Sequence, residues 1–333
     1  MPVLKAKGIE TIVVLLHEGG AATGLYSECV GISGPIFEIA NAFDAEVDVV
    51  VAGHTNAAHT CNLGGKLVTS AASAGRLVTD IDIKVDERTG DVTVMAANNV
   101  IVTRDVIRDA DQTAFIAKYD ALAAPFANRV VASVAGDLTK AANPAGESTM
   151  GLTIADSQLA STTPSGAVAA FMNPGGVRAD LLAATISGGE AVGQATYGEV
   201  FTVQPFGNTL VTLTVTGAQI DTMLEQQWSL VGGVEKANIL QVSEGFRYTW
   251  DSTRPIGDRV APASITLGGA ALDLGATYRI TVNSFLATGG DGFAVLVQGT
   301  DRVGGPVDLD ALEAYLLPRS PFAAPALGRI TRL

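Results

Sequence analysis

Two short apolar runs, separated by a stretch with helical spacing, constrain the fold of the first part of this chain more than any other feature. Residues 9–16 contain a continuous aliphatic run, and residues 47–52 repeat that design. The stretch from Ile36 to Phe43 between them has helical spacing. The order strand–helix–strand predicts parallel pairing in a covered sheet. Further strands are expected at 66–70, 77–84 and 92–103.

A long helix is expected to connect two parts of the chain. At 333 residues the chain is long enough for two separate cores. Residues 109–128 have helical spacing, with Asp111 placed to cap the helix and Pro125 placed to end or kink it. We expect the domain boundary in or just after this helix. Its apolar side chains form a stripe, namely Phe115, Ile116, Tyr119, Leu122 and Phe126.

Shorter mixed elements are expected after residue 129. Residues 151–162 predict a helix, and alternating apolar residues predict strands around 211–215 and 278–282. The stretch from Thr216 to Gln219 matches a capping box. A final helix is expected at 309–317.

Charge and hydropathy exclude several classes of partner. Lys+Arg number 21 and Asp+Glu number 34, so the formal net charge is −13. A nucleic-acid or anionic-membrane surface needs clustered lysine and arginine, so we expect neither partner. No apolar run is long enough to span a bilayer, and residues 1–8 are not followed by the apolar region of a signal peptide.

Two cysteines, Cys29 and Cys61, lack the spacing of a metal site. Two interpretations stay open. They are either buried thiols or one disulfide that closes a loop, and a disulfide would indicate an oxidising compartment.

Histidines follow both apolar runs of the first part. His17 and His54 each lie just past the carboxyl end of a predicted strand. Because such ends meet at one edge of a parallel sheet, the two imidazoles are expected to converge. Asn56 adds an amide oxygen, so the three side chains are candidate ligands for a divalent cation. The alternative is two partly buried histidines bonded to backbone, and His59 is expected in a surface loop.

A glycine-rich turn in the second part carries an arginine. It runs from Asn173 through Gly175, Gly176 and Arg178 to Asp180, after an apolar strand-like run. Glycine lets backbone approach a ligand closely, and the arginine fork suits phosphate or a polar, oxygen-rich ligand.

Two more glycine-flanked segments follow, and together they predict a nucleoside pocket. Phe206 and Phe285 are placed to stack on a planar heterocycle. Asp291 can accept hydrogen bonds from ribose hydroxyls, and Asn173, Arg178 and Asn208 can complete a polar ring around a sugar or phosphate. The alternative is that the phenylalanines anchor loops and the glycines form ordinary turns.

With these motifs the chain resembles the bifunctional metallophosphatase/5′-nucleotidase family, in particular its actinobacterial type. The similarity runs through essentially the whole chain. The motifs that carry it are Glu147 to Asp156, Asn173-Pro174-Gly175-Gly176-Val177-Arg178-Ala179-Asp180, Tyr197 to Asn208, Phe285 to Phe293, His17, and Gly53-His54-Thr55-Asn56.

The resemblance implies a fold that is α/β and α+β. Residues 1–110 are expected to form the C-terminal portion of a calcineurin-like metallophosphoesterase β-sandwich with helices. Residues 111–128 are then the linker helix, and residues 129–333 are a complete mixed α/β nucleotide-binding domain of the 5′-nucleotidase C-terminal type.

The resemblance also implies a function, the metal-dependent hydrolysis of nucleotide phosphate monoesters. The family holds two divalent metal ions (zinc, manganese or similar) in the first domain, where His17, His54 and Asn56 match ligand positions. The base is expected between Phe206 and Phe285, with Asp291 on the ribose and Asn173, Arg178 and Asn208 as polar contacts. An extracellular, cell-wall or periplasmic location is implied.

One departure from the family bears on activity. The family's early motifs, which hold most metal ligands and the catalytic histidine, have no counterpart before His17. We therefore expect no catalytic residue in this chain, an incomplete metal site, little hydrolysis, and possible association with a missing N-terminal half or with itself. The alternatives are a nucleotide-binding module without catalysis, or a 2′,3′-cyclic nucleotide or UDP-sugar hydrolase of the same fold.

Overall fold

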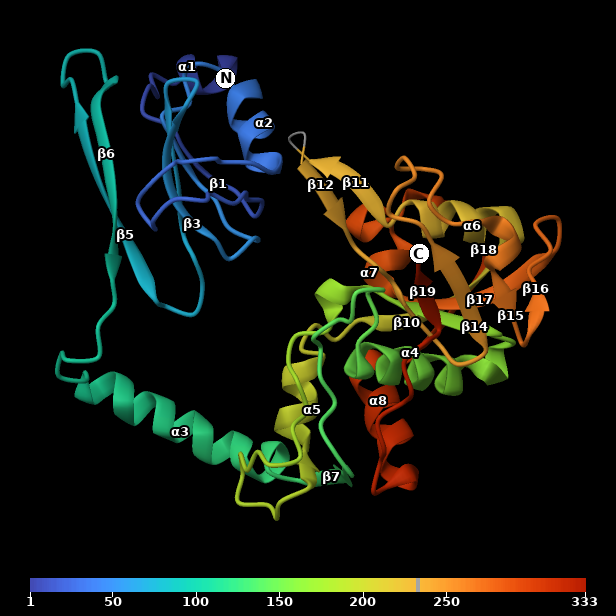
Figure 1. The fold of residues 1–333 in the computed structure, drawn as a ribbon. Coiled ribbons are helices and arrows are strands. Elements are labelled where there is room, and N and C mark those ends of the chain that lie inside the picture. Colours follow the sequence, from blue (N-terminus) through green and yellow to red (C-terminus); the bar gives the residue numbers. More distant parts are fainter. Residues whose placement is uncertain (232–233) are drawn as a thin grey trace. The chain divides into compact units, whose positions relative to one another are not determined.

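The computed structural model describes residues 1–231 and 234–333, and the chain divides into two compact units (Figure 1). Each unit has its own hydrophobic core. Unit 1 comprises Met1–Asp109 with Leu230–Lys236, and unit 2 comprises Ala110–Ser229 with Ala237–Leu333.

Unit 1 is built on a four-stranded sheet in the order β1-β2-β4-β3. The predicted parallel pairing of the first two strands is confirmed, and the helix α2 connects them. Side chains from α2, β2 and β4, among them Ile36, Val50 and Val68, form its core. The elements are α1 (Pro2–Lys5), β1 (Val13–Leu15), α2 (Pro35–Ala42), β2 (Val49–Val51), β3 (Ala58–Leu63) and β4 (Lys66–Ala71).

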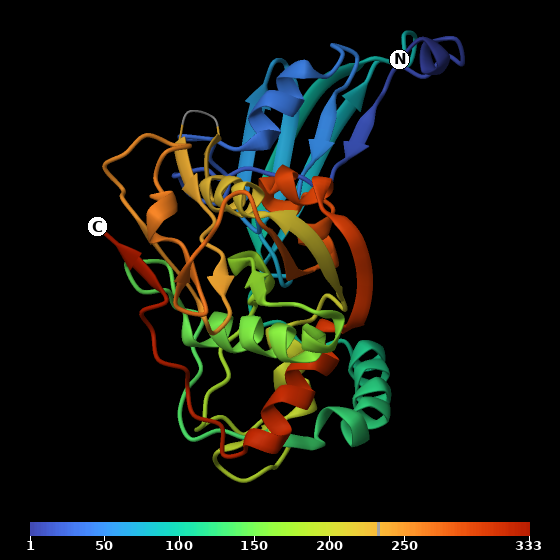
Figure 2. The ribbon, with the colours of Figure 1, turned by 90° about the vertical axis from the view of Figure 1, so that its right-hand side faces the viewer.

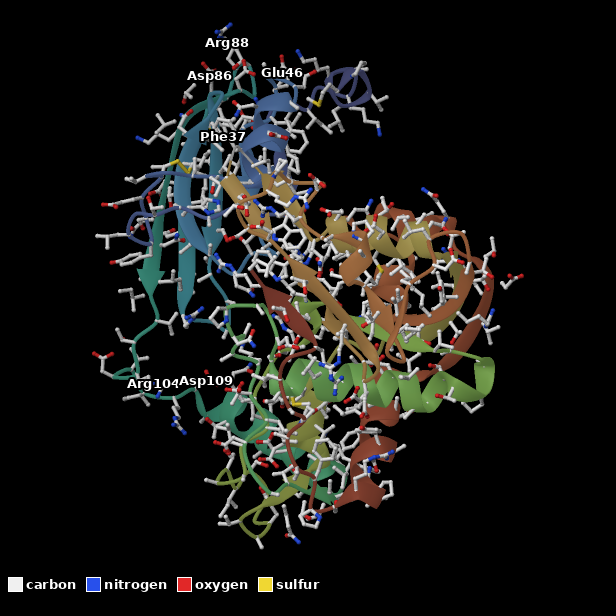
Figure 3. The ribbon with its side chains drawn as sticks, turned by 45° about the vertical axis from the view of Figure 1, so that its right-hand side comes forward. Phe37, Glu46, Asp86, Arg88, Arg104 and Asp109 are labelled. Carbon is white, nitrogen blue, oxygen red and sulfur yellow. A yellow bond between two sulfur atoms is a disulfide. The ribbon has the colours of Figure 1, made fainter. Side chains whose placement is uncertain are left out.

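A long antiparallel ribbon completes unit 1. It consists of β5 (Leu77–Val85) and β6 (Val92–Ile101), and its turn carries Asp86 and Arg88 (Figure 3). Buried Asn99 attaches the ribbon to the sheet, since its Nδ2 donates to the carbonyl of Ser70 at 3.0 Å. The buried amide of Asn99 therefore holds the ribbon to the sheet through polar contacts.

Strand β3 was not predicted, and it corrects the expectation for His59. The turn between β3 and β4 is Gly64-Gly65, with φ of +59° and +84°, and this pair of positive angles is the signal of a two-residue hairpin. His59 therefore lies in a paired strand and not in a surface loop, and its side chain is fully buried. Neither ring nitrogen has a hydrogen-bond partner among the described residues.

The two cysteines form a disulfide. Cys29 and Cys61 are joined across a sequence separation of 32. The bond ties the segment between β1 and α2 to β3, the first strand of the β3–β4 hairpin. Of the two interpretations that the sequence left open, the structure therefore supports the bridge.

Unit 2 begins with the long helix α3 (Ala110–Ala127). The helix continues past Pro125 to Ala127, which corrects the expectation that it ends at the proline. Pro125 has no N–H to donate to the carbonyl of Ala121, so the last turn of the helix forms without that backbone hydrogen bond. The C-terminal end of α3 lies beside β7 (Val130–Ser133) and α5 (Tyr197–Val203) (Figures 1 and 2), and no residue of α3 is buried.

A five-stranded sheet in the order β13-β8-β17-β10-β18 forms the centre of unit 2. β8 and β17 are parallel, and the other pairs are antiparallel. The strands are β8 (Ala169–Met172), β10 (Thr209–Thr216), β13 (Gln241–Val242), β17 (Thr277–Asn283) and β18 (Thr300–Val307).

Helices cover both faces of this sheet (Figure 1). Adjacent residues Phe171 and Met172 of β8 belong to different hydrophobic clusters, and neighbouring residues of a strand point to opposite faces. α4 (Thr149–Thr162) and α8 (Asp308–Leu316) pack with Met172, while α6 (Gly217–Glu225) and α7 (Ser284–Ala287) pack with Phe171. Unit 2 thus has a helix–sheet–helix arrangement.

Smaller elements complete the two units. The predicted capping box at Thr216 is present at the start of α6, and a second one at Thr196 starts α5. None of the described helices combines the length and hydropathy needed to cross a bilayer. The remaining strands and the fifth helix are β7 (Val130–Ser133), β9 (Gln194–Thr196), α5 (Tyr197–Val203), β11 (Trp228–Val231), β12 (Val234–Ala237), β14 (Phe246–Trp250), β15 (Thr266–Leu267), β16 (Ala270–Ala271) and β19 (Ile330–Arg332). Short 3₁₀ turns lie at Thr163–Ser165, Pro174–Gly176, Pro262–Ser264, Gly290–Gly292, Ala294–Gln298 and Leu317–Arg319.

Candidate functional site

The candidate nucleoside site in unit 2 lies where two neighbouring strands end. β8 ends at Met172 and is followed by Asn173, and β17 ends at Asn283 and is followed by α7. Because β8 and β17 are parallel neighbours, their carboxyl ends lie at the same edge of the sheet. Ligands of α/β proteins gather at this edge.

A chain of amide hydrogen bonds holds the polar centre of this site. Asn283 Nδ2 donates to Asn173 Oδ1 at 3.0 Å, and Asn173 Nδ2 donates to Asp291 Oδ2 at 2.8 Å. Asn173 and Asn283 are buried, so the carboxylate is held from inside the protein. Asp291 adopts φ of +55°, a left-handed conformation that a non-glycine residue rarely takes. The exposed carboxylate keeps Oδ1 without a partner among the described residues and can accept a ligand hydroxyl.

Phe285 lies on α7 beside this carboxylate loop. A Cβ on Gly290 would come within 2.5–2.6 Å of three carbons of the Phe285 ring, so the ring rests directly on glycine backbone. The ring stays 43% exposed. A glycine at position 290 therefore lets one ring face pack while leaving surface for a ligand.

Phe206 and Arg178 form the other candidate wall. The Arg178 guanidinium carbon lies 5.5 Å from the centroid of the Phe206 ring, within cation–π range. The Arg178 side chain donates to the carbonyl of Gly175 at 3.2 Å, and its backbone N–H donates to the carbonyl of Val203 at 3.0 Å. Phe206 is 56% exposed. The glycine-rich turn is thus connected directly to the loop that carries Phe206.

Asn208 links the Phe206 loop to α7 and α8. Its Nδ2 donates to Asp308 Oδ2 at 3.3 Å, and its Oδ1 accepts from Ser284 Oγ at 3.3 Å. Burial raises the pKa of Asp308, and the hydrogen bond from Asn208 opposes that rise. Asn208 therefore has a positioning role in this structure, and both polar groups of its amide already have protein partners.

Three residues of this network were missed by the sequence analysis: Asn283, Ser284 and Asp308. Asn283 and Ser284 directly follow an alternating strand, which is the signal that identified Asn173, and Asn283 also caps α7 through its side chain. Asp308 gave no comparable signal, because only the fold brings it to Asn208.

Two acidic residues of the recognised motifs have a structural role. Glu147 accepts three backbone N–H groups, those of Gly328, Arg329 and Ile330, at 2.6–2.8 Å. Asp156 forms a buried bidentate ion pair with Arg329. Both carboxylates hold the C-terminal segment that ends in β19.

In unit 1 the two candidate ligand histidines converge as predicted. His17 Nε2 and His54 Nδ1 lie 3.3 Å apart, and both side chains are exposed. Gly53 N–H donates to the carbonyl of Glu18 at 3.0 Å, and Thr55 Oγ1 donates to the carbonyl of Gly20 at 2.7 Å, so the two histidine loops are bonded to each other.

The histidine loops fit one divalent ion better than two. Two imidazole nitrogens this close can share one ion, and Asn56 at φ of +55° follows on the same loop. Across the described ranges, no carboxylate, cysteine or further histidine joins these nitrogens in a group of three donors within 4.8 Å. A pair of ions needs a bridging carboxylate that this cluster lacks.

The geometry can be compared with known proteins. Residues 129–298, half of the chain, match the family described as 5′-nucleotidase, C-terminal domain. Endonuclease YhcR of Bacillus subtilis is 30% identical over 98% of this chain and 25% of its own length. Cell wall protein Lmo0130 of Listeria monocytogenes is 31% identical over 87% of this chain and 38% of its own length.

The crystal structure of a 5′-nucleotidase precursor from Thermus thermophilus has a similar fold. It superposes with a TM-score of 0.67 at 30% identity, over 100% of this chain and 66% of that protein. This similarity confirms the expected mixed α/β fold class. The chain spans about a quarter to two thirds of the length of these three proteins.

Proposed function

The chain belongs to the family of the 5′-nucleotidase C-terminal domain, and from this membership we propose that unit 2 binds a nucleotide as part of a phosphoric ester hydrolase. The observation that carries the proposal is the hydrogen-bonded chain from Asn283 through Asn173 to Asp291, flanked by two exposed phenylalanines. Such an arrangement combines fixed polar acceptors with apolar surface, as small-molecule sites do.

Each side chain of the site has a proposed role. Phe206 and Phe285 stack on the base, since every base offers a π-face to an aromatic ring. The free Oδ1 of Asp291 accepts a ribose hydroxyl. Arg178 contacts the sugar or phosphate with the guanidinium nitrogens that do not bond Gly175, and Asn173 and Asn208 hold Asp291 and the Phe206 loop in place.

For unit 1 we propose a divalent-metal site at His17, His54 and Asn56. Neutral imidazole nitrogens and an amide oxygen suit zinc or manganese. Bound divalent ions in such enzymes activate water and polarise a phosphoryl oxygen. This chain's own contribution is to hold two imidazoles at one point through the bonds between the two histidine loops.

We further propose that this chain alone binds nucleotide but hydrolyses it slowly. A two-metal mechanism needs a bridging carboxylate, and the cluster of described donors around His17 and His54 has none. The same observation favours the second candidate function, a nucleotide-binding module without catalysis. Robust metal-dependent phosphate release from AMP by the purified chain would contradict slow hydrolysis and leave the binding proposal intact.

The binding proposal is tested by titrating the intact chain with AMP and adenosine in a calorimeter. Phe206→Ala and Phe285→Ala are each expected to weaken binding about tenfold or more, because stacking contributes roughly 1–3 kcal/mol per base. Phe37→Ala is the matched control, since Phe37 on α2 is also 43% exposed (Figure 3) and belongs to unit 1. Unchanged affinity in both site variants would refute the proposal. Saturable binding of a single-stranded oligonucleotide, without binding of AMP or adenosine, would instead indicate a nucleic-acid ligand.

We propose an extracellular or cell-envelope location. The disulfide between Cys29 and Cys61 requires an oxidising compartment to form and persist. The similarity to a cell wall protein points the same way. Quantifying free thiols in the protein isolated from its native host tests this, and two free cysteines would argue against it.

A further inference from the structure

The linker helix α3 carries an apolar face that the described structure leaves uncovered. Its five large apolar side chains are 52% to 71% exposed: Phe115, Ile116, Tyr119, Leu122 and Phe126. No residue of the helix is buried, and its contact with the rest of unit 2 is at the C-terminal end, where Ala127 packs against Gly198 of α5. Contiguous exposed apolar surface of this kind marks an interaction site.

The spacing of this face is that of a helix–helix seam. Phe115, Tyr119, Leu122 and Phe126 follow one another at intervals of four, three and four residues. This is the alternation of a and d positions in a coiled coil, in which apolar residues recur every 3.5 residues. A seam with this spacing fits another helix with the same spacing better than it fits a sheet or a flat surface.

The stripe is also complementary to itself when two copies run antiparallel. A two-fold axis between Tyr119 and Leu122 places Phe115 against the partner's Phe126, and Tyr119 against the partner's Leu122. Every large residue of the seam then meets a large apolar residue of the other copy. Antiparallel packing also opposes the two helix dipoles, which favours it over the parallel arrangement.

Local charge permits such pairing although the whole chain is strongly acidic. Residues 104–129 contain four basic and four acidic side chains, a balance of zero in a chain with a net charge of −13. Arg104 and Asp109, at the segment that leads into α3, belong to this balanced set (Figure 3). Two copies of α3 can therefore approach without the repulsion that other surfaces would produce.

The area of the face is sufficient for a specific dimer. A fully buried aromatic side chain covers about 150–250 Å², so the five half-exposed side chains present on the order of 600 Å² in each copy. Two copies would bury about 1,200 Å², the lower bound for specific protein–protein interfaces. Contacts beside the seam would add to this area.

We propose that the α3 face is a homodimer interface in which two copies of this chain pair their linker helices antiparallel. The partner is a second copy of the chain, and the seam consists of Phe115, Tyr119, Leu122 and Phe126. Ile116 borders it.

Sedimentation velocity of the full chain over a range of concentrations tests the proposal. The parent chain is expected to form a concentration-dependent dimer. Leu122→Glu is expected to raise the dimer dissociation constant about a hundredfold, because the buried charge occurs twice in the symmetric interface. Ala117→Glu, on the opposite, exposed face of α3, is the matched control and should leave the dimer intact. A parent chain that stays monomeric, or equal effects of the two variants, would overturn the proposal.

Cysteine cross-linking tests the orientation. In the antiparallel register two copies of Leu122 lie about 4–5 Å apart along the axis, whereas two copies of Phe115 lie about 16 Å apart, at 1.5 Å per residue. Under mild oxidation Leu122→Cys should form a covalent dimer and Phe115→Cys should not. Cross-linking of Phe115→Cys to itself would refute the antiparallel arrangement. A monomeric parent whose Leu122→Glu variant loses thermal stability would show that another part of the same chain covers the face.

Discussion

The two candidate sites of this chain are held in place by different means. The residues of the proposed nucleoside site in unit 2 are held by buried groups, since Asn173 is 4% exposed and bonds both Asn283 and Asp291. The imidazoles of unit 1 lie on exposed loops that are bonded to each other, and a disulfide ties the surrounding segments together. The buried network holds its site from inside the protein, whereas the exposed histidine loops depend on the hydrogen bonds between them and on a disulfide between the segments that follow each loop.

The largest effect should come from removing that disulfide. Replacing both Cys29 and Cys61 with serine is expected to destabilise unit 1 by about 3–4 kcal/mol, the chain-entropy value for a loop of this length. Hydrogen exchange should accelerate across β1 to β4 and stay unchanged in β8, β10 and β17. If unit 2 strands exchanged faster to the same extent, the two sites would not be independently stabilised.

The next effect concerns the buried network. Asn173→Ala removes the amide that joins Asn283 to Asp291. The Asn283 amide then loses an acceptor and the Asp291 carboxylate loses a donor, which should lower the free energy of unfolding by about 1–3 kcal/mol. Calorimetric unfolding should show this loss, and nucleoside binding should weaken because Asp291 is no longer held. The control is Asn143→Ala, which removes a partly buried amide bonded to Glu147 and should lower stability without a direct effect on binding. Binding that survives Asn173→Ala unchanged would remove the network from the proposed site.

A smaller effect is expected at the imidazole pair. His54→Ala leaves one imidazole and should weaken zinc binding about tenfold or more, with no change in the affinity for adenosine. Isothermal titration with zinc chloride measures the first quantity, and the adenosine titration measures the second. His59→Ala is the comparison variant, because His59 is buried and lies outside the histidine loops. Equal zinc affinity in His54→Ala and the parent would refute the assignment of His54 as a ligand.

The smallest effect is a pH dependence confined to unit 1. Burial lowers the pKa of His59 in the folded chain. The folded chain therefore binds a proton on this imidazole less readily than the unfolded chain, in which the pKa of the imidazole is about 6.5. The stability of unit 1 should therefore be constant above that pH and fall as the pH drops below it. Hydrogen exchange of β3 at several pH values, corrected for intrinsic rates, measures the fall. His59→Phe should reduce the pH dependence, and a variant as pH-sensitive as the parent would exclude His59 as its source.

The sequence indicated most residues of the candidate site, because they stand beside local signals. Asn173, Arg178, Phe206, Phe285 and Asp291 all lie next to glycines or at strand ends, where the pattern itself indicates a turn open to a ligand. The strand–helix–strand order likewise predicted the parallel pairing of β1 and β2. The hairpin at Gly64-Gly65 had an equally local signal, and missing it misplaced His59.

Other features depend on contacts between distant segments. The bonds from Asn208 to Asp308 and from Glu147 to the C-terminal backbone span 100 and more than 180 positions, so no local pattern contains them. The sequence showed the stripe on α3, but only the fold showed that the rest of unit 2 contacts this helix at its end and leaves the stripe exposed. Local backbone preferences and apolar periodicity are properties of the sequence itself, and they determined the elements and the turns that carry the site. The burial of side chains and the choice of hydrogen-bond partners depend on which surfaces the folded chain brings together. Only the tertiary structure decided these features.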